Sequence, residues 1–327
     1  MLYRAWTFNA STTEPTELIQ HHLTVKALGD YELLVENHAI ALNPVDWKII
    51  RPGFLEGSAV QVAGVDGAGI VLAAGKLAKT AVGSRIAYHQ SIRGNGSYGE
   101  MAIVDSRLSW PVPAHIRFSD AAALVCPGLT ALQSLQKLPS MQQQCVLVHG
   151  AGTLVGTLLV QLLAAAGARV IAVASSRHQE HLLKLGALGV VNYQQQQVLA
   201  DTQALLGEHK LTALFDCIDA EKVAAFYPLL DVNSHVITIQ GRLTNNPFPA
   251  FDKAISLHEV ALNTLHRYPS AGQITALQTE FAKLLQCGVS TVEPRLQTIS
   301  FAEIPQSLQK LKQGQYAKYV AILKAEQ

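Results

Sequence analysis

Short runs rich in hydrophobic residues, separated by turn residues, make up the first third of the chain. Such runs predict β-strands, and turn residues such as Gly53 and the glycine-rich stretch 91–99 separate them. The strands expected from this pattern are residues 3–8, 32–40, 67–75, 84–89 and 99–105. This part of the chain is therefore predicted to be a β-rich unit that ends near residue 118.

A different pattern begins at Ser119. This residue is a suitable N-cap and Asp120 follows in the first turn, which predicts a helix that Pro127 and Gly128 interrupt. Apolar runs then alternate with helical segments, as in parallel sheets built from strand–helix–strand units. The expected strands are residues 145–150, 169–175, 190–193, 211–218 and 235–241, with helices over 153–166 and 178–186. The pattern predicts an α/β protein with a doubly wound parallel sheet.

The last segment of the chain mixes both kinds of pattern. We expect a helix over 273–288, a strand within 292–301, a short helix after Glu303 and a final strand over 319–323. The run of glutamines at 194–197 is expected to be a solvated loop.

Composition and charge exclude several classes of protein. With 49% hydrophobic and 15% charged residues the chain is too apolar for a disordered protein, and its length predicts about two domains. The 25 basic and 24 acidic residues give a net charge of +1, so no nucleic-acid partner is expected. The four cysteines lie too far apart for a CxxC pair, which favours a reduced compartment; they are Cys126, Cys145, Cys217 and Cys287.

The most apolar window, residues 153–174, is divided by polar residues and glycines into pieces shorter than a membrane span. The first residues carry neither an apolar signal core nor an amphipathic transit pattern. We therefore expect no membrane partner and a cytoplasmic location.

A glycine-rich turn between the first two strands of the parallel sheet is the main cofactor signal. Gly150, Gly152 and Gly156 fit the tight turn and close backbone approach that a pyrophosphate needs, although the GxGxxxG spacing is one residue longer than usual. The alternative is a plain strand-to-helix turn. About 20 residues further on stand Ser175, Ser176 and Arg177 instead of an acid, which favours the 2′-phosphate of NADPH over NADH.

Two alternatives stay open at this point. Arg177 is also what a solvated helix start contains. His178 and His181 lie one helical turn apart and resemble half of a metal site, but no third ligand is in view, so a solvated helix face is favoured.

Several sequence blocks together resemble the medium-chain dehydrogenase/reductase superfamily, in its zinc-free quinone oxidoreductase and enoyl reductase branch. The blocks occur in the order and approximate spacing of that family, at 41–53, 62–71, 82–88, 127–135, 148–156, 185–193 and 215–219. The resemblance implies a GroES-like, partly barrelled catalytic domain and a Rossmann domain, with the active site in the cleft. The expected boundaries are 1–118 for the first part of the catalytic domain, 119–288 for the Rossmann domain and 289–327 for the return to the catalytic domain.

The resemblance also implies site residues. For the cofactor these are Thr130, Gly150, Gly152, Thr153, Leu154, Val155, Gly156, Ser175, Ser176, Arg177, Tyr193, Gln240 and Gly241. Asn43, Asp46 and Lys48 are the candidates for catalysis, with Trp47, Tyr88 and His89 for the substrate pocket. Each has a structural alternative: the first two can cap a turn at Pro44, Lys48 can be solvated, and the pocket residues can belong to the core. The resemblance also implies a homodimer that pairs edge strands of the cofactor domains. The candidate edge strand in this chain begins at Leu257.

Three departures from the family pattern bear on the chemistry. Asn43 and Val65 stand where zinc-dependent relatives have their first two ligands, and Cys126, near the third, would be alone, so no catalytic zinc is expected. Thr153 replaces the glycine nearest the pyrophosphate and could either crowd the phosphate or bond to it. Asp219 replaces a common glycine and places a carboxylate at the sheet edge.

The leading hypothesis is an NADPH-dependent, zinc-independent oxidoreductase. Its small electrophilic substrate would be a quinone or the activated double bond of an α,β-unsaturated carbonyl, and orientation would supply most of the catalysis. One alternative is a metal-free carbonyl reductase, disfavoured because no residue stands out as a proton donor. A non-catalytic NADPH-binding protein is the other.

Overall fold

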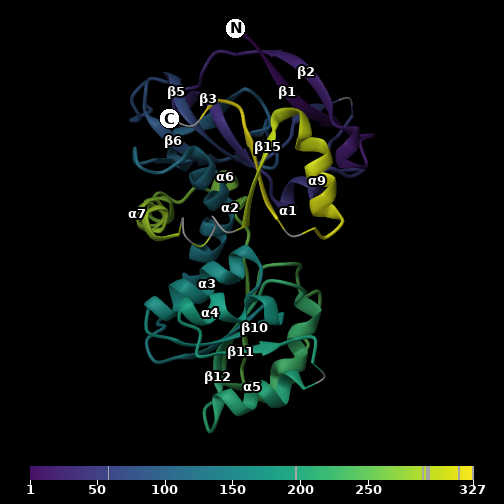
Figure 1. Cartoon of the computed structure of the whole chain (residues 1–327), viewed down its shortest axis with the longest axis vertical. Coiled ribbons are helices and arrows are strands. Elements are labelled where there is room, and N and C mark those ends of the chain that lie inside the picture. The colour runs from purple at the N-terminus through teal and green to yellow at the C-terminus, as the bar shows by residue number, and fades with distance from the viewer. Residues whose placement is uncertain (58, 196, 289–290, 292–294, 316, 326–327) are drawn as a thin grey trace. The chain divides into compact units, whose positions relative to one another are not determined.

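The computed structural model describes all residues except 58, 196, 289–290, 292–294, 316 and 326–327 (Figure 1). The chain divides into two compact units. Residues 1–126 and 263–327 form the first unit, and residues 127–262 form the second.

Antiparallel strands build the first unit. A three-stranded sheet has the order β2-β1-β4, and a seven-stranded sheet has the order β15-β16-β3-β5-β6-β8 with β7 paired to β3. Among the described strands of this unit, β15 and β16 are the pair that runs parallel. The bounds are β1 Leu2–Asn9, β2 Ile19–Thr24, β3 Glu32–Ala41, β4 Val60–Val62, β5 Asp66–Ala74, β6 Arg85–His89, β7 Met101–Asp105, β8 Ser109–Pro111, β15 Leu296–Ser300 and β16 Lys318–Ile322. This is the GroES-like, partly barrelled architecture that was predicted.

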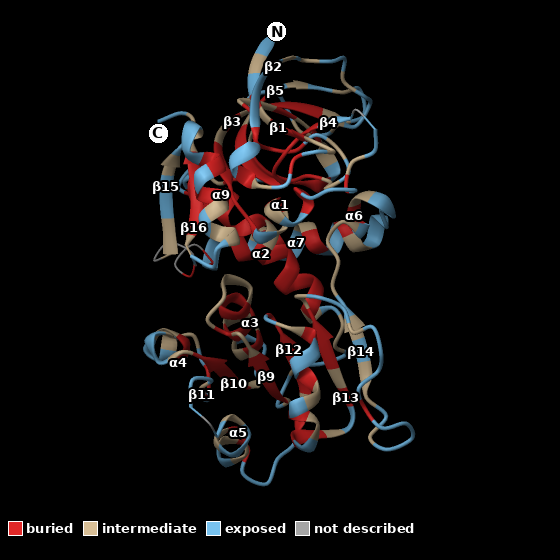
Figure 2. Ribbon diagram, turned by 90° about the vertical axis from the view of Figure 1, so that its right-hand side faces the viewer, coloured by how far each residue is buried: buried red, intermediate tan, exposed pale blue. Residues whose placement is uncertain are grey.

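Helices complete the first unit: α1 Pro44–Ile49, α6 Thr264–Arg267, α7 Ala271–Cys287 and α9 Ile304–Lys312. Figure 2 shows the buried residues concentrated in the strands and on the inner sides of the helices. One core cluster joins Ile40, Tyr98, Ile304 and Ala321, all fully buried. Segments from both ends of the chain thus share one core.

The second unit is a six-stranded sheet with all neighbours parallel, in the order β11-β10-β9-β12-β13-β14. Its strands are β9 Cys145–His149, β10 Arg169–Ala174, β11 Gly189–Asn192, β12 Leu211–Asp216, β13 Leu230–Thr238 and β14 Ser256–Glu259. The helices are α3 Leu154–Ala165, α4 Gln179–Lys184, α5 Val198–Leu206 and the 3-10 segment η4 Ala220–Leu229. The parallel Rossmann-type sheet predicted from the alternating pattern is confirmed.

The helix expected to break at Pro127 is continuous. It is α2, Phe118–Leu135, and Pro127 lies inside it. Leu124 and Leu129 on either side of the proline have no exposed surface. Burial of these flanking apolar side chains offsets the hydrogen bond that proline removes.

The unit boundaries also differ from those expected at 118 and 288. The helix α7 belongs to the first unit, because its Phe281 ring packs 4.9 Å from the Trp110 ring of β8. Gln278 of the same helix donates to the carbonyl of Arg107 at 2.9 Å. A helix following a strand in sequence can pack on either unit, and these long-range contacts decide which.

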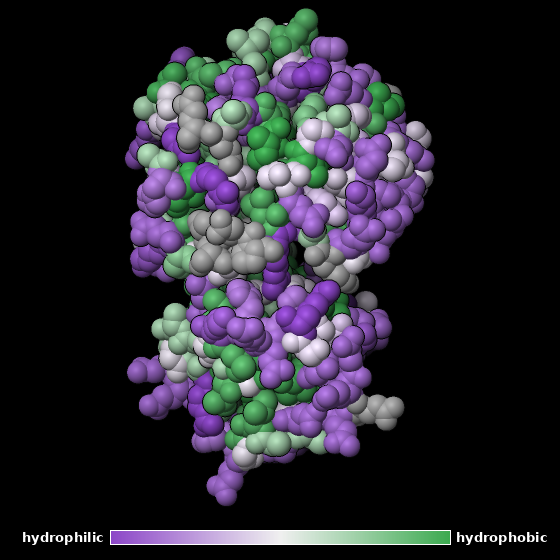
Figure 3. Space-filling model, in the orientation of Figure 1, coloured by the Kyte–Doolittle hydropathy of each residue, from purple (hydrophilic) through white to green (hydrophobic). Residues whose placement is uncertain are grey.

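In the described part of the chain, no helix combines the length and the apolar character that crossing a bilayer requires. On the face drawn in Figure 3, hydrophilic side chains are spread over both units, with smaller groups of hydrophobic ones between them.

Candidate functional site

The glycine turn of the second unit has the backbone geometry that its sequence predicted. Gly150 follows β9 directly and has φ +79, a conformation that favours glycine. The N–H groups of Gly150 and Ala151 donate to the carbonyl of Val173 in β10, at 3.1 and 3.0 Å. A side chain at 150 would also meet Ile218, whose Cγ1 lies 2.4 Å from the position a Cβ would take.

Gly156 lets α3 approach the strand closely. A Cβ here would lie 2.4 Å from the carbonyl oxygen of Gly150 and 2.7 Å from the Cα of Ala151, and neither backbone atom can move aside cheaply. At Gly152 a Cβ would lie 2.7 Å from Cδ2 of His178. The two glycines therefore let α3 and the His178 ring pack closely against the turn.

The hydroxyl of Thr153 is already hydrogen-bonded within the turn. It is the N-cap of α3: its Oγ1 accepts from the Gly156 N–H at 3.0 Å and donates to the Gly150 carbonyl at 2.9 Å. The first N–H groups of a helix lack partners within the helix. The Thr153 hydroxyl satisfies the N–H group of Gly156. The N–H groups of Leu154 and Val155 are therefore the candidates for binding an anion at this helix start.

Most other predicted cofactor residues lie along the same edge of the sheet, because each follows the carboxyl end of a parallel strand. Ser175, Ser176 and Arg177 follow β10, and the last two are exposed. Tyr193 follows β11 and Gln240 and Gly241 follow β13. Thr130 is the exception, since it lies inside α2 with its side chain buried.

The sequence favours a solvated helix face for His178, whereas in the structure this residue contacts the same edge of the sheet. Its ring lies against Gly152, and its Nε2 accepts from Nε of Arg177 at 3.1 Å. The segment that follows β10 is thus in contact with the glycine turn.

Sequence reasoning missed a histidine–aspartate pair at the same edge. Nδ1 of His149, the last residue of β9, is 2.7 Å from Oδ1 of Asp216, the last residue of β12. The carboxylate also accepts from the N–H groups of Ile218 and Asp219, at 3.3 and 3.0 Å. Asp219, whose carboxylate was noted in the sequence, caps η4 by accepting from the N–H of Glu221. The His149–Asp216 pair thus links the ends of β9 and β12 to the loop that follows β12.

A buried polar network lies in the first unit around Asn43. Its Nδ2 donates to Oδ2 of Asp66 at 2.8 Å, and its Oδ1 accepts from Nζ of Lys318 at 2.6 Å. Lys318 also donates to the carbonyl of Leu42. All three side chains are at most 7% exposed. Asp66 and Lys318 were not singled out from the sequence; the only signal was a charged residue within each of two otherwise apolar strands.

Asp46 is joined to this network through the start of α1. Its Oδ2 accepts from the N–H of Asn43 and from the hydroxyl of Tyr98, both at 2.7 Å, and it forms a capping box with Asn43. Its Oδ1 is buried with no partner among the described residues. Burial raises the pKa of Asp46 to about 7, against the lowering effect of these hydrogen bonds. The capping geometry that was the structural alternative for both residues is present.

Asp46→Asn is expected to flatten the pH dependence of stability. The folded-state pKa of Asp46 lies above its unfolded value, so the folded protein binds more protons between about pH 4 and pH 7. Stability therefore falls as pH rises through this window, by an amount on the order of 2–4 kcal/mol. The amide keeps the acceptor oxygen but cannot ionise.

Urea unfolding of the parent and the variant across this pH range measures the effect. Asp30→Asn, at an exposed aspartate, is the matched control. Equal slopes for the parent and Asp46→Asn would contradict the prediction.

The remaining predicted residues of the first unit lie in different surroundings. Lys48 is exposed, with Nζ 5.7 Å from the centre of the Trp47 ring, and partial burial lowers its pKa. Tyr88 has no exposed surface, and its hydroxyl donates to Oδ1 of Asn37 at 2.7 Å. It therefore belongs to the core and offers no surface to a substrate. His89 is nearly buried, with Nδ1 2.8 Å from Oδ1 of Asp66.

The donors at the position of the family's zinc site do not suit Zn²⁺. Asn43 contributes an amide that already bonds to a lysine ammonium and a carboxylate, and Val65 is apolar. The Lys318 ammonium beside Asn43 would repel a dication. Within the described residues, no group of three or more His, Cys, Asp or Glu side chains could hold a metal ion.

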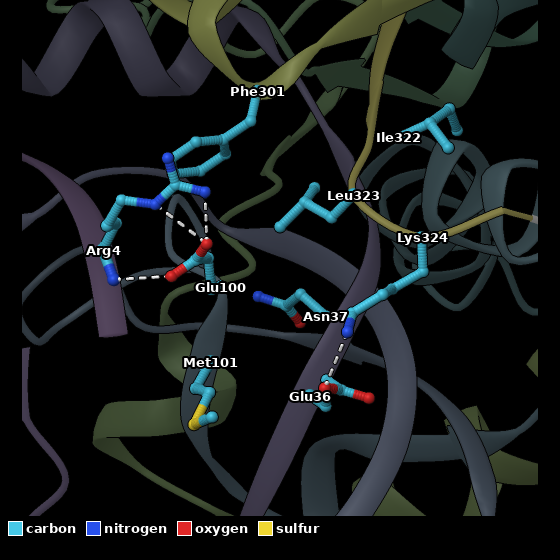
Figure 4. Close-up of a pocket in the computed structure, with 9 residues that line it drawn as sticks. All are labelled: Arg4, Glu36, Asn37, Glu100, Met101, Phe301, Ile322, Leu323 and Lys324. Atoms are coloured by element: carbon cyan, nitrogen blue, oxygen red, sulfur yellow. Dashed lines mark hydrogen bonds and ion pairs between the residues drawn. The ribbon is translucent and has the colours of Figure 1, made fainter. Parts of the chain in front are cut away.

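A pocket of about 310 Å³ lies elsewhere on the first unit, lined by polar and apolar side chains (Figure 4). Arg4 pairs there with Glu100, and Lys324 lies 3.2 Å from Glu36. Because these charges neutralise one another, the pocket presents no unpaired charge to a ligand, and we assign it no function.

Two family models match the chain. The alcohol dehydrogenase GroES-like domain matches residues 29–114 and the zinc-binding dehydrogenase model matches residues 155–289. The fold and the glycine turn thus define a member of the medium-chain dehydrogenase/reductase superfamily. The chain belongs to the zinc-free quinone oxidoreductase and enoyl reductase branch of this superfamily.

Individual relatives agree with this assignment. The chain is 31% identical over 228 residues to trans-enoyl reductase TOXD of Cochliobolus carbonum, covering 64% of this chain and 74% of that protein. It is 33% identical over 219 residues to a chloroplast envelope quinone oxidoreductase homolog of Arabidopsis thaliana, covering 64% and 66%. For four relatives from fungi and a plant, the matched segment covers between 57% and 66% of the length of each relative.

The fold is also that of solved structures. The Escherichia coli quinone oxidoreductase complexed with NADPH superposes with a TM-score of 0.82 over 98% of this chain and 99% of that one, at 22% identity.

Proposed function

We propose that the protein is an NADPH-dependent, zinc-independent oxidoreductase that reduces a quinone or the activated double bond of an α,β-unsaturated carbonyl. The observation that carries this proposal is the tight glycine turn at the start of α3. A Cβ at Gly156 would lie 2.4 Å from the carbonyl oxygen of Gly150, so the close packing of helix and turn requires a glycine there. The quinone oxidoreductases and trans-enoyl reductases among its relatives support the reaction class.

The residues of the second unit fit the proposed cofactor. The N–H groups of Leu154 and Val155 at the start of α3 would bind the pyrophosphate. Ser176 and Arg177, both exposed at the neighbouring strand end, would bind the 2′-phosphate through charge-assisted hydrogen bonds. When bound, NADPH supplies the hydride. The edge strand β14 remains our proposed surface for a homodimer.

On the substrate side, α1 presents donors for a carbonyl oxygen. Asn43 and Asp46 fix the start of this helix through their capping box, and so they position the residues that follow. Nε1 of Trp47 is buried without a partner among the described residues, and Nζ of Lys48 lies 5.7 Å from the centre of the Trp47 ring. Either N–H donor would stabilise negative charge on a carbonyl oxygen as it develops.

The first experiment is a fluorescence titration of the purified protein with NADPH and with NADH. We expect tighter binding of NADPH. The double variant Ser176→Ala/Arg177→Ala is expected to weaken NADPH binding about 10- to 100-fold and to leave NADH binding nearly unchanged, because only the 2′-phosphate loses its donors.

Lys210→Ala, which removes an exposed cation of the same unit, controls for a general change of charge. Absence of binding for both nucleotides up to millimolar concentration would overturn the proposed function. An unchanged preference in the double variant would refute the assignment of these two residues.

A further inference from the structure

We propose that His89, oriented by Asp66, is the proton donor to the substrate oxygen in the reaction. This inference rests on the proposed function and gives the site the acid that sequence reasoning did not find. It concerns a histidine for which the sequence suggested only a place in the pocket wall.

The geometry is that of a histidine held by a carboxylate. Nδ1 of His89 lies 2.8 Å from Oδ1 of Asp66, and the two side chains are 4% and 0% exposed. The other oxygen of Asp66 accepts from Nδ2 of Asn43 and from the N–H of Cys126, at 2.8 and 2.9 Å. Two N–H donors already bond to one oxygen of Asp66, and a carboxylate oxygen accepts, so the close contact with the other oxygen is made when Nδ1 of His89 carries a proton. The transferable proton then resides on Nε2.

Nε2 of His89 is not committed to another group. Within the described part of the chain it has no hydrogen-bond partner. The ring that faces it is His266 of α6, with centroids 5.5 Å apart. Burial lowers the pKa of His266 to about 3, so this ring is neutral and its buried Nε2 has no described partner.

Ionisable groups of both signs surround His89. Asp66 on β5 contacts it directly, and His266 on α6 is neutral. Beyond Asn43 lie the Lys318 amino group on β16 and the Asp46 carboxyl on α1. His89 is therefore the member of this network whose second ring nitrogen stays available.

The second histidine–aspartate pair lacks these properties. Asp216 uses both oxygens on the backbone of the loop after β12, and the His149 ring packs 5.5 Å from the Phe226 ring. That pair joins strand ends, whereas the His89 pair belongs to the network that also fixes the start of α1. The comparison favours His89 as the acid.

The proposed step moves one proton. Hydride addition to the substrate carbon places a negative charge on the carbonyl or quinone oxygen, the reductant being the dihydronicotinamide of the proposed function. The Nε2–H bond of His89 breaks, an O–H bond forms on the substrate, and the electron pair of the N–H bond stays on Nε2. The neutral imidazole then takes a proton from water.

The test compares His89→Gln with His209→Gln, a control at an exposed histidine after α5. The probes are NADPH with 2-cyclohexen-1-one and with 1,4-benzoquinone. For His89→Gln we expect kcat to fall about 100-fold, with the Kd for NADPH unchanged.

Two further measurements keep the result interpretable. Asp66→Asn is expected to lower kcat as well, because the imidazole loses the carboxylate that orients it. In the protein without nucleotide, ¹⁵N spectra should show His89 with a protonated Nδ1 and, when neutral, a bare Nε2.

Near-parental kcat in His89→Gln, or a bare Nδ1 in the spectra, would overturn the proton-donor role. A parent protein that fails to bind NADPH would instead overturn the proposed function, and the spectra would still decide the orientation of His89.

Discussion

Gly156→Ala is expected to weaken NADPH binding by about tenfold or more and to destabilise the protein by roughly 1–3 kcal/mol. The added methyl group would lie 2.4 Å from the Gly150 carbonyl oxygen and 2.7 Å from the Ala151 Cα. Since both are backbone atoms, relief requires α3 to move away from β9, and this movement displaces the N–H groups that would bind the pyrophosphate.

Fluorescence titration with NADPH and thermal unfolding measure the two effects. Gly272→Ala is a matched control, because a Cβ at this position in α7 meets no atom within 4 Å. If Gly156→Ala bound NADPH as tightly as Gly272→Ala, the glycine turn would not be the nucleotide site.

Lys318→Met should destabilise the protein by about 3–5 kcal/mol near neutral pH. The substitution keeps the apolar volume but removes the buried ammonium that bonds to Asn43 and lies close to Asp66 and Asp46. Both carboxyl groups are fully buried, so the loss leaves negative charge in the interior without a compensating cation. Denaturant unfolding measures the change.

Lys324→Met is the control, because this lysine near the end of the same strand forms an exposed ion pair with Glu36 that is worth at most about 1 kcal/mol. The double variant Lys318→Met/Asp66→Asn should recover part of the loss, since it removes a charge of each sign. The deficit of Lys318→Met should also shrink as pH falls, because a carboxyl whose folded-state pKa is raised, as that of Asp46 is, becomes protonated. A deficit independent of both changes would point to packing rather than charge.

The parts of this fold that the sequence predicts are those in which neighbouring residues carry the information. The apolar runs of the parallel sheet and the glycine turn at Gly150 depend on local periodicity and on backbone freedom. The resemblance to a family added the GroES-like unit and the places of Asn43 and Asp46.

What the sequence did not predict depends on contacts between distant segments. Lys318 and Asn43 are 275 positions apart, and only the pairing of β16 with β3 brings them together. The sequence makes Tyr88 a candidate for the substrate pocket, but in the structure its side chain is completely buried. The continuous helix through Pro127 likewise depends on burial, which local propensity does not report.

The arrangement of strands in the first unit constrains the order in which the chain can fold during its synthesis. The second unit is a continuous segment, residues 127–262, so all of its strands are available before the remainder of the chain has been made. The first unit must wait for β15 and β16, because β16 pairs with β3 and carries the ammonium that lies near Asp66. On this side of β3, β7 already pairs with Glu32–Glu36, so until then only the end at 39–41 is an unpaired edge, of the kind that invites association between nascent chains. The middle of the chain therefore reaches its native structure before the beginning does.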